Sequence, residues 1–193
     1  MKRFTGTRGM IVLLLLLCML AGYYFYLSNK GEKDEEVNAT KVQEVLLRDL
    51  SRNYPATPKE VVRYYSEIMQ CLYNEEYTEE EFKKLADQAR ILMDQELADN
   101  NPAEQYYLQV KNVVDDFREK KKTINNASVC DSNQVKYSTI GGFECAYVTS
   151  SYFVREKDGF SKSNQNFVLR KDEENRWKIL AFELAEGEVW DSE

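Results

Sequence analysis

The positions of the hydrophobic residues divide the chain into three parts with different periods. The first is the uncharged run from Met10 to Leu27, of which Ile11–Leu17 is entirely aliphatic. Apolar residues then recur every three or four positions as far as Lys122, which is the spacing of helices with one buried face. Beyond Lys122 they alternate with polar residues, as in strands. This order predicts a hydrophobic helix, then a group of helices, then a sheet.

The run from Met10 to Leu27 has the length of a membrane span. Its eighteen residues, rising about 1.5 Å each in a helix, cover roughly 27 Å, close to the hydrocarbon thickness of a bilayer. Three basic residues and no acidic residue precede it, so the positive-inside rule places the N-terminus in the cytoplasm. We therefore expect a cytoplasmic tail at 1–9, a signal anchor contacting the lipid bilayer at 10–28, and an extracytoplasmic domain.

Two other interpretations of this run were weighed. A cleaved signal peptide needs small residues at two positions before the cut, and here Ala21 or Gly22 supplies one while Met19 or Leu20 fills the other. A lipoprotein signal needs a small residue just before the cysteine, but leucines precede Cys18. We prefer the uncleaved anchor in the cell membrane, leave the cleaved peptide open and reject the lipoprotein.

Four sequences that resemble helix starts follow the polar linker at 29–38. Thr40, Thr57 and Thr78 each have a glutamine or glutamate three positions later, the pattern of a capping box. The fourth is Asn101-Pro102-Ala103-Glu104. We predict a short connecting helix within 39–54 and three longer helices after the other starts. Their expected buried stripes are Val61, Val62, Tyr65, Ile68, Met69 and Leu72; Phe82, Leu85, Ala86, Ala89, Leu92 and Met93; and Tyr106, Val110, Val113, Val114 and Phe117.

The second half of the domain is predicted to be an antiparallel sheet, because turn sequences separate its alternating segments by only a few residues. Asp158-Gly159 is one of these turns, and Gly141-Gly142 is a further turn or a bulge. The expected strands are Thr123–Asp131, Phe143–Arg155, Phe160–Arg170 and Arg176–Leu184. An acidic tail at 186–193 follows. Helices first and a curved antiparallel sheet afterwards define an α+β fold, here one domain at 55–185 with its helices on one face.

This order of elements resembles the cone-shaped nuclear transport factor 2-like fold, which is also called cystatin-like and is shared with ketosteroid isomerases. The resemblance rests on the opening helix after Thr57-Pro58, the long paired strands after Phe143, and the closing segment Trp177-Lys178-Ile179. The whole chain is also similar to uncharacterised membrane-anchored proteins of Gram-positive, clostridial gut bacteria, on segments such as 46–50 and 73–81. The first resemblance implies a cone; the second implies no activity.

Composition narrows the function further. The chain has no histidine, which excludes Ser-His-Asp catalysis and histidine-ligated zinc within the chain. Residues 31–193 hold 22 basic and 33 acidic residues, a net charge of −11. Such an acidic domain does not bind nucleic acid by default. We assign no catalytic, cofactor-binding or metal-binding residue and expect no cofactor.

An isomerase-like or hydrolase-like site would need a carboxylate and a tyrosine in one apolar pocket. The candidates are Tyr64, Tyr65 and Glu67 on the opening helix and Glu144, Tyr147 and Tyr152 on the long strand. Strand alternation places Glu144 and Tyr152 on one face and Tyr147 on the other. We prefer packing or surface roles for all six residues.

The cysteines allow one structural hypothesis. Cys130 and Cys145 lie in segments expected to be neighbouring strands, so a disulfide between them is one option outside the cytoplasm. Buried free thiols are the other, and we prefer it.

Three functions remain. We prefer a membrane-tethered, non-catalytic domain that binds a ligand or an unidentified membrane protein. The alternatives are the carboxylate–tyrosine enzyme and an assembly subunit, which resembles the anchored domains of type IV secretion systems in topology alone.

Overall fold

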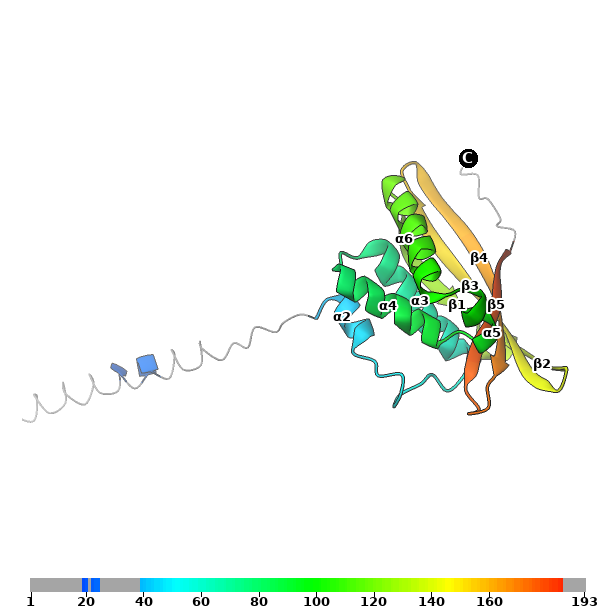
Figure 1. Ribbon diagram of the computed structural model, residues 1–193. Helices are drawn as coiled ribbons and strands as arrows, with labels where there is room; N and C mark the ends of the chain where they lie inside the picture. The colour runs from blue at the N-terminus through cyan, green and yellow to red at the C-terminus, as the bar shows by residue number, and fades with distance from the viewer. Residues whose placement is uncertain (1–18, 21, 25–38, 186–193) are drawn as a thin grey trace, which may run out of the picture. The chain divides into compact units, whose positions relative to one another are not determined.

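The structure is a computed structural model that describes residues 19–20, 22–24 and 39–185. The chain divides into two units, Met1–Ala39 and Thr40–Glu193, and the architecture below is that of the second unit (Figure 1). The described residues include no helix that is both long and apolar enough to cross a membrane. Of the span expected at 10–28, residues 19–20 and 22–24 are described and are helical. The tail at 1–9, most of the span, the whole linker at 29–38 and the acidic tail at 186–193 lie outside the described residues.

The helices precede the strands, as expected. They are α2 (Lys41–Leu46), α3 (Pro58–Asn74), α4 (Glu79–Ile91), α5 (Gln95–Asn100) and α6 (Ala103–Glu119). Thr40, Thr57 and Thr78 each accept a hydrogen bond from a backbone N–H of the first helical turn, and the backbone N–H of each threonine donates to the side-chain oxygen of the partner glutamine or glutamate. These three predicted capping boxes are confirmed.

The fourth predicted start has the right position but the wrong cap. The cap of α6 is Pro102, and no side chain bonds to the first turn. The Asn101 amide instead donates to the Leu97 carbonyl oxygen at 2.9 Å. Asn101 therefore closes α5, a short helix that the hydrophobic pattern did not predict. The connecting helix is also shorter than the range 39–54, because α2 ends at Leu46.

The strands are β1 (Thr123–Val129), β2 (Lys136–Ile140), β3 (Phe143–Glu156), β4 (Gly159–Lys171) and β5 (Trp177–Ala185), with a 3₁₀ turn, η1 (Ser132–Gln134), before β2. They form one antiparallel sheet in the order β1-β3-β4-β5, with β2 paired to the other end of β3. The α+β class is therefore correct. Strand β2 was not predicted. It pairs with β3 across Gly141 and Gly142, whose φ angles of 59° and 87° favour glycine.

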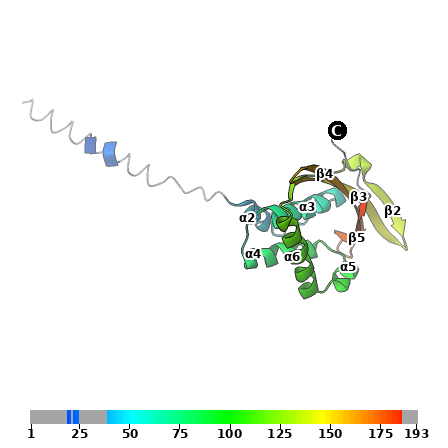
Figure 2. The same ribbon diagram turned by 90° about the horizontal axis from the view of Figure 1, so that it is seen from above.

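The helices cover one side of the curved sheet, as Figure 2 shows from above. Ala146, Val148, Ser150, Tyr152 and Val154 of β3 are all buried, so the predicted parity of this strand is confirmed. The core is formed where the stripe of α3 meets strands β3, β4 and β5. Its fully buried side chains include Val61, Val62, Ile68, Leu72, Phe167, Leu169 and Ile179.

Helix α6 departs from the expected packing. Tyr106 and Val114 are buried, but Val113, which the periodicity assigned to the same stripe, is 53% exposed. The helix packs mainly against α3 and α4 rather than against the strands. Its apolar side therefore faces a space in front of the sheet instead of a filled interface.

Candidate functional site

The space beside α6 is an apolar pocket of about 620 Å³, bounded by α3, α6, the loop before α5 and the inner face of the sheet. Its volume falls within the range of roughly 300–1,000 Å³ that is typical of sites for small ligands. Its apolar and aromatic lining consists of Tyr65, Met69, Tyr73, Met93, Leu97, Tyr106, Val110, Val113, Phe117, Ile124, Tyr152, Val154, Phe182 and Leu184. Asn101, Gln109, Ser163, Gln165 and Glu183 complete the wall.

Helix α3 presents three pocket residues at the spacing of one helical face. Tyr65, Met69 and Tyr73 are four residues apart, so their side chains stack along the same side of the helix. At one end of the pocket the Tyr73 ring meets the Phe117 ring of α6 edge-on, with centroids 4.7 Å apart. This contact joins the two helices.

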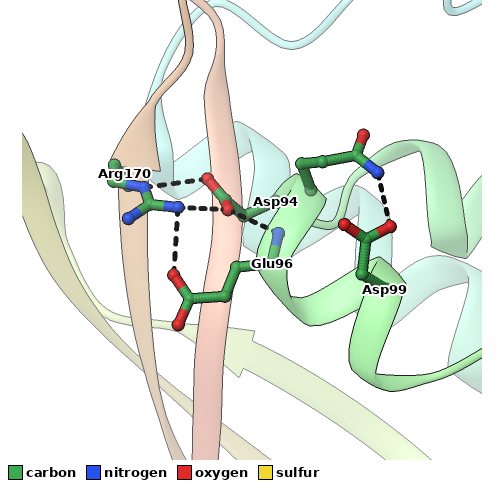
Figure 3. A network of polar contacts seen from close by, with 5 residues as sticks. Asp94, Glu96, Asp99 and Arg170 are labelled. Carbon is green, nitrogen blue, oxygen red and sulfur yellow. Dashed lines mark hydrogen bonds and ion pairs between the residues drawn. The ribbon is translucent and has the colours of Figure 1, made fainter.

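An ion pair joins the α5 region to the sheet next to the pocket residue Met93 (Figure 3). Asp94 caps α5 and receives two hydrogen bonds from the Arg170 guanidinium of β4, while Glu96 receives a third at 3.3 Å. The segment before α5 also bonds to β5, because the Asp94 N–H donates to the Ile179 carbonyl and the Ile179 N–H donates to the Leu92 carbonyl, each at 2.8 Å. These bonds fix Met93, which lies between Leu92 and Asp94, in the pocket wall.

One of the pocket tyrosines has its hydroxyl fully engaged. The Ser66 hydroxyl donates to the Val62 carbonyl at 2.9 Å and lies 2.8 Å from the Tyr152 hydroxyl. Because Ser66 has a single proton and gives it to Val62, Tyr152 must be the donor in the second bond. Tyr152 therefore has no proton left for a ligand.

Tyr65 and Tyr106 differ in this respect. The Tyr106 hydroxyl is buried and has no hydrogen-bond partner among the described residues. The Tyr106 hydroxyl lies near that of Tyr65 and adds to the rise in the Tyr65 pKa, yet the two groups do not make a well-formed hydrogen bond. Burial raises the pKa of both tyrosines well above the ordinary value. Both hydroxyls therefore stay protonated and able to donate at physiological pH.

Charged groups are nearly absent from the pocket wall. Glu183 is the single charged residue among the described residues that line it, and it is exposed. Its neighbours Phe182 and Leu184 line the pocket as well, so strand alternation directs the Glu183 carboxylate to the other face of the sheet. The Arg90 guanidinium lies 5.7 Å from the Tyr106 ring, but it donates to the carbonyls of Ala98 and Asn101. The interior is thus neutral.

The structure separates the six residues considered for a carboxylate–tyrosine site. Tyr65 and Tyr152 line the pocket, but Tyr64 donates on the other side of α3 to Val45 and Gln88. Glu67 is part-exposed near Arg63.

The remaining two candidates lie towards the β2 end of β3. The Glu144 side chain is 63% exposed and pairs with Lys171, and Tyr147 is 37% exposed. No carboxylate candidate therefore meets the two pocket tyrosines.

The three cysteines among the described residues are free thiols. Cys71 and Cys145 are buried and Cys130 is part-exposed. The Cys130 N–H donates to the carbonyl of Thr149, four positions along β3 from Cys145. The disulfide considered between Cys130 and Cys145 is therefore not formed, because the register of the two strands does not place the cysteines opposite each other.

A second groove, of about 640 Å³, lies between α2, α3 and β1. Charged residues of both signs line it, and several of them are already paired. Lys41 lies 3.5 Å from Glu75, and the Arg48 guanidinium sits 4.6 Å above the Tyr64 ring. Across the described part of the chain, no three potential metal ligands come together. The apolar pocket is therefore the stronger candidate site.

The sequence contained a signal for this pocket that the predicted buried stripe of α3 does not include in full. Tyr73 follows Tyr65 by eight residues and Met69 by four, so an aromatic and sulfur-containing row was visible on α3. Phe182 was likewise assigned to a strand without a role. Periodicity marks such residues as inward-facing, but it does not distinguish a filled core from a cavity.

Comparison with known proteins gives a family and no activity. A family model described as a domain of unknown function (DUF6715) matches residues 1–182. No curated protein matches the chain.

Proposed function

The chain belongs to the family of domains of unknown function DUF6715, and from that premise we propose a single-pass membrane protein whose extracytoplasmic domain binds a small, largely apolar ligand without reacting with it. The observation that carries this proposal is the neutral pocket of about 620 Å³ beneath α6. A wall of aromatic, methionine and aliphatic side chains suits a ligand that buries most of its surface.

A binding role is preferred to catalysis because of what surrounds the pocket. General acid–base chemistry needs a titratable group within hydrogen-bond reach of the reacting atom. The described wall offers tyrosines with raised pKa values and the outward-facing Glu183. Tyrosines in that state are hydrogen-bond donors rather than bases.

The membrane location and the cone-like fold are proposed from the sequence. The uncharged run from Met10 to Leu27, with basic residues before it, supports a signal anchor with the N-terminus inside. The curved sheet with helices on one side supports the resemblance to the nuclear transport factor 2-like fold. The proposal implies that relatives of this chain share this fold and occur in clostridial bacteria.

Binding is tested with a neutral apolar dye such as N-phenyl-1-naphthylamine, whose fluorescence rises in apolar surroundings. The full chain is held in lipid nanodiscs, and empty discs report partition of the dye into lipid. Val113→Trp places a large ring at the pocket wall and should remove most of the protein-dependent signal. Leu108→Trp is the matched control, since Leu108 is 64% exposed on the same helix and does not line the pocket. Equal signals from the two variants would contradict the proposal.

Orientation is tested by cysteine accessibility. Ser192→Cys in intact cells should react with a membrane-impermeant thiol reagent, in a background where Cys130 is replaced by serine. Ser28→Cys tests the C-terminal end of the expected anchor in the same way. Labelling that requires cell lysis would place the domain in the cytoplasm and overturn this part of the proposal.

An assembly role has one observation in its favour. Ile140, Phe143 and Tyr147 share a face where β2 pairs with β3, and they are 53%, 54% and 37% exposed. Exposed apolar side chains of this kind are typical of protein contacts. If they bind a membrane protein, Ile140→Lys with Phe143→Lys should shrink the complex isolated with mild detergent, while Phe160→Lys, at another exposed aromatic position, should not.

A further inference from the structure

Tyr65 and Tyr106 are two of the pocket residues that carry a hydrogen-bond donor. Tyr65 and Tyr106 each carry one hydroxyl proton. The Tyr106 hydroxyl is buried without a hydrogen-bond partner among the described residues, and Tyr65 lines the same pocket. If Tyr106 donated to the Tyr65 oxygen, the Tyr65 proton would still lack an acceptor. One acceptor supplied from the pocket would satisfy both groups in series.

The positions of the two tyrosines give them different roles in such a series of hydrogen bonds. Tyr65 lies on α3 in the row that faces the pocket, and its ring packs edge-on against Phe167 beneath it, at 5.6 Å between centroids. Tyr106 lies on α6, and its hydroxyl is closed off from solvent. Tyr65 is therefore placed to donate to a ligand, and Tyr106 is placed to donate to Tyr65.

The charge of the pocket restricts the ligand further. A buried anion is costly unless a cation or several donors compensate it. No cationic side chain lines the described wall, and the nearby Arg90 is occupied by backbone carbonyls. A cationic ligand would in turn find no inward-facing carboxylate.

We propose that the ligand is a neutral, mostly apolar molecule with one hydrogen-bond acceptor, such as a ketone, ester or ether oxygen, which accepts from Tyr65 while Tyr65 accepts from Tyr106. This inference rests on the proposed function, and it adds the chemical class of the ligand. Tyr65 is the contact residue and Tyr106 is a positioning residue. The apolar body of the ligand lies against Met69, Met93 and the aromatic rings.

The test uses three probes of similar shape that differ in one group: acetophenone, α-methylstyrene and benzoate. The first has a carbonyl oxygen, the second a methylene group in its place, and the third a carboxylate. Binding is followed by NMR of methyl-labelled methionine in the full chain in nanodiscs. Met69 and Met93 line the pocket, whereas the other methionines, Met1, Met10 and Met19, belong to the N-terminal unit. A shift of the two pocket signals therefore reports occupancy directly.

The expected result is a selective loss. Tyr65→Phe should weaken acetophenone about two- to tenfold, the range for one net hydrogen bond, and should leave α-methylstyrene unchanged. Tyr106→Phe should weaken acetophenone by a smaller factor, again without an effect on α-methylstyrene, which a purely structural role would not produce. Tyr107→Phe is the matched control. Tyr107 lies beside Tyr106 on α6, but its hydroxyl donates to Asp87 of α4 at the surface.

Three outcomes would overturn the inference, and they separate it from the proposed function. If both neutral probes bind and neither Tyr65→Phe nor Tyr106→Phe changes their affinity, the tyrosines do not donate to the ligand, although the apolar site exists. Tighter binding of benzoate than of acetophenone would show that the site prefers an anion. Unchanged Met69 and Met93 signals with every probe would remove the binding site itself.

Discussion

Asp94 and Arg170 are 76 residues apart in the chain and form a two-point ion pair that joins the cap of α5 to strand β4. The Asp94 side chain is 6% exposed and that of Arg170 is 23% exposed. The pair holds the segment of Met93 against β5, so it acts on the shape of the pocket as well as on stability. Asp94 is also the N-cap of α5 and accepts from the Glu96 N–H at 3.0 Å.

Replacing Asp94 with alanine should therefore destabilise the domain strongly. The change removes a helix cap and leaves the Arg170 guanidinium with Glu96 as its remaining partner. We expect a loss of about 2–3 kcal/mol in the free energy of unfolding, measured by urea denaturation. In a double-mutant cycle, Asp94→Ala with Arg170→Met should cost less than the sum of the single changes. Glu80→Gln, at a fully exposed pair with Lys84, is the control and should change nothing measurable. Additive losses would show that the pair is not coupled.

The tyrosines of the pocket should respond in opposite directions to loss of their hydroxyls. Tyr106→Phe removes a buried donor that has no acceptor, so the ligand-free protein should become about 1 kcal/mol more stable. Tyr152→Phe removes the hydrogen bond to Ser66 and should cost about 1 kcal/mol. Thermal and urea unfolding of both variants measure the two effects. A destabilised Tyr106→Phe would mean that its hydroxyl already has a partner.

Stability should fall at alkaline pH. Burial raises the pKa of the Cys71 thiol from 9.0 to about 11, and that of Tyr64 from 10.0 to about 12. A folded-state pKa above the unfolded value means that the unfolded chain loses these protons first. The stability that these two protonated groups contribute is therefore complete at a pH below their unfolded-state pKa values. It is lost as the pH rises through their folded-state pKa values.

Urea denaturation across the range from pH 9 to pH 11 tests this expectation. Cys71→Ala should lower the dependence on pH relative to the parent, and Cys130→Ala is the control. Lys178, whose pKa is lowered chiefly by burial, changes the stability in the opposite direction as the pH rises. Its effect is the same in the parent and in Cys71→Ala, so the difference between the two proteins excludes it. An identical pH dependence in the parent and Cys71→Ala would contradict the assignment to this thiol.

Thiol reactivity should distinguish the cysteines of the domain. Cys130 is part-exposed, whereas Cys71 and Cys145 are each 3% exposed. In a Cys18→Ser background, Ellman's reagent should react quickly with one thiol of the folded protein, and Cys130→Ser should abolish that phase. Access governs the rate here, since the high pKa of Cys71 further suppresses its thiolate. A fast phase that persists in Cys130→Ser would show that a buried thiol becomes exposed.

Much of the local structure followed from the sequence because its causes are local. A threonine followed three residues later by glutamine or glutamate stabilises a helix start through bonds within one turn, and all three such starts are present. Alternation along β3 likewise predicted which side chains share a face, and from Ala146 to Val154 one of these faces is buried. The strand order and the antiparallel sheet followed from short turns, with the exception of β2, whose five residues are all exposed and carry no burial pattern.

The site depended on contacts that no local pattern records. Val113 has the spacing of a buried residue, yet α6 stands on α3 and α4 and leaves a pocket beside it. Glu144 has the parity of the core face, yet it lies at the end of β3 that carries β2 and is exposed. Cys130 and Cys145 lie on paired strands, yet the register separates them.

Most helices and strands, α5 and β2 excepted, and their apolar faces could therefore be predicted from the sequence, because spacing and capping act within a few residues. Tertiary structure alone decided that an apolar face of α6 borders a cavity and that Tyr65 and Tyr106, 41 positions apart in the numbering, both line it. It also decided that Asp94 meets Arg170 at the edge of this pocket. Those relationships arise from the relative placement of whole elements, which depends on the sum of many distant contacts.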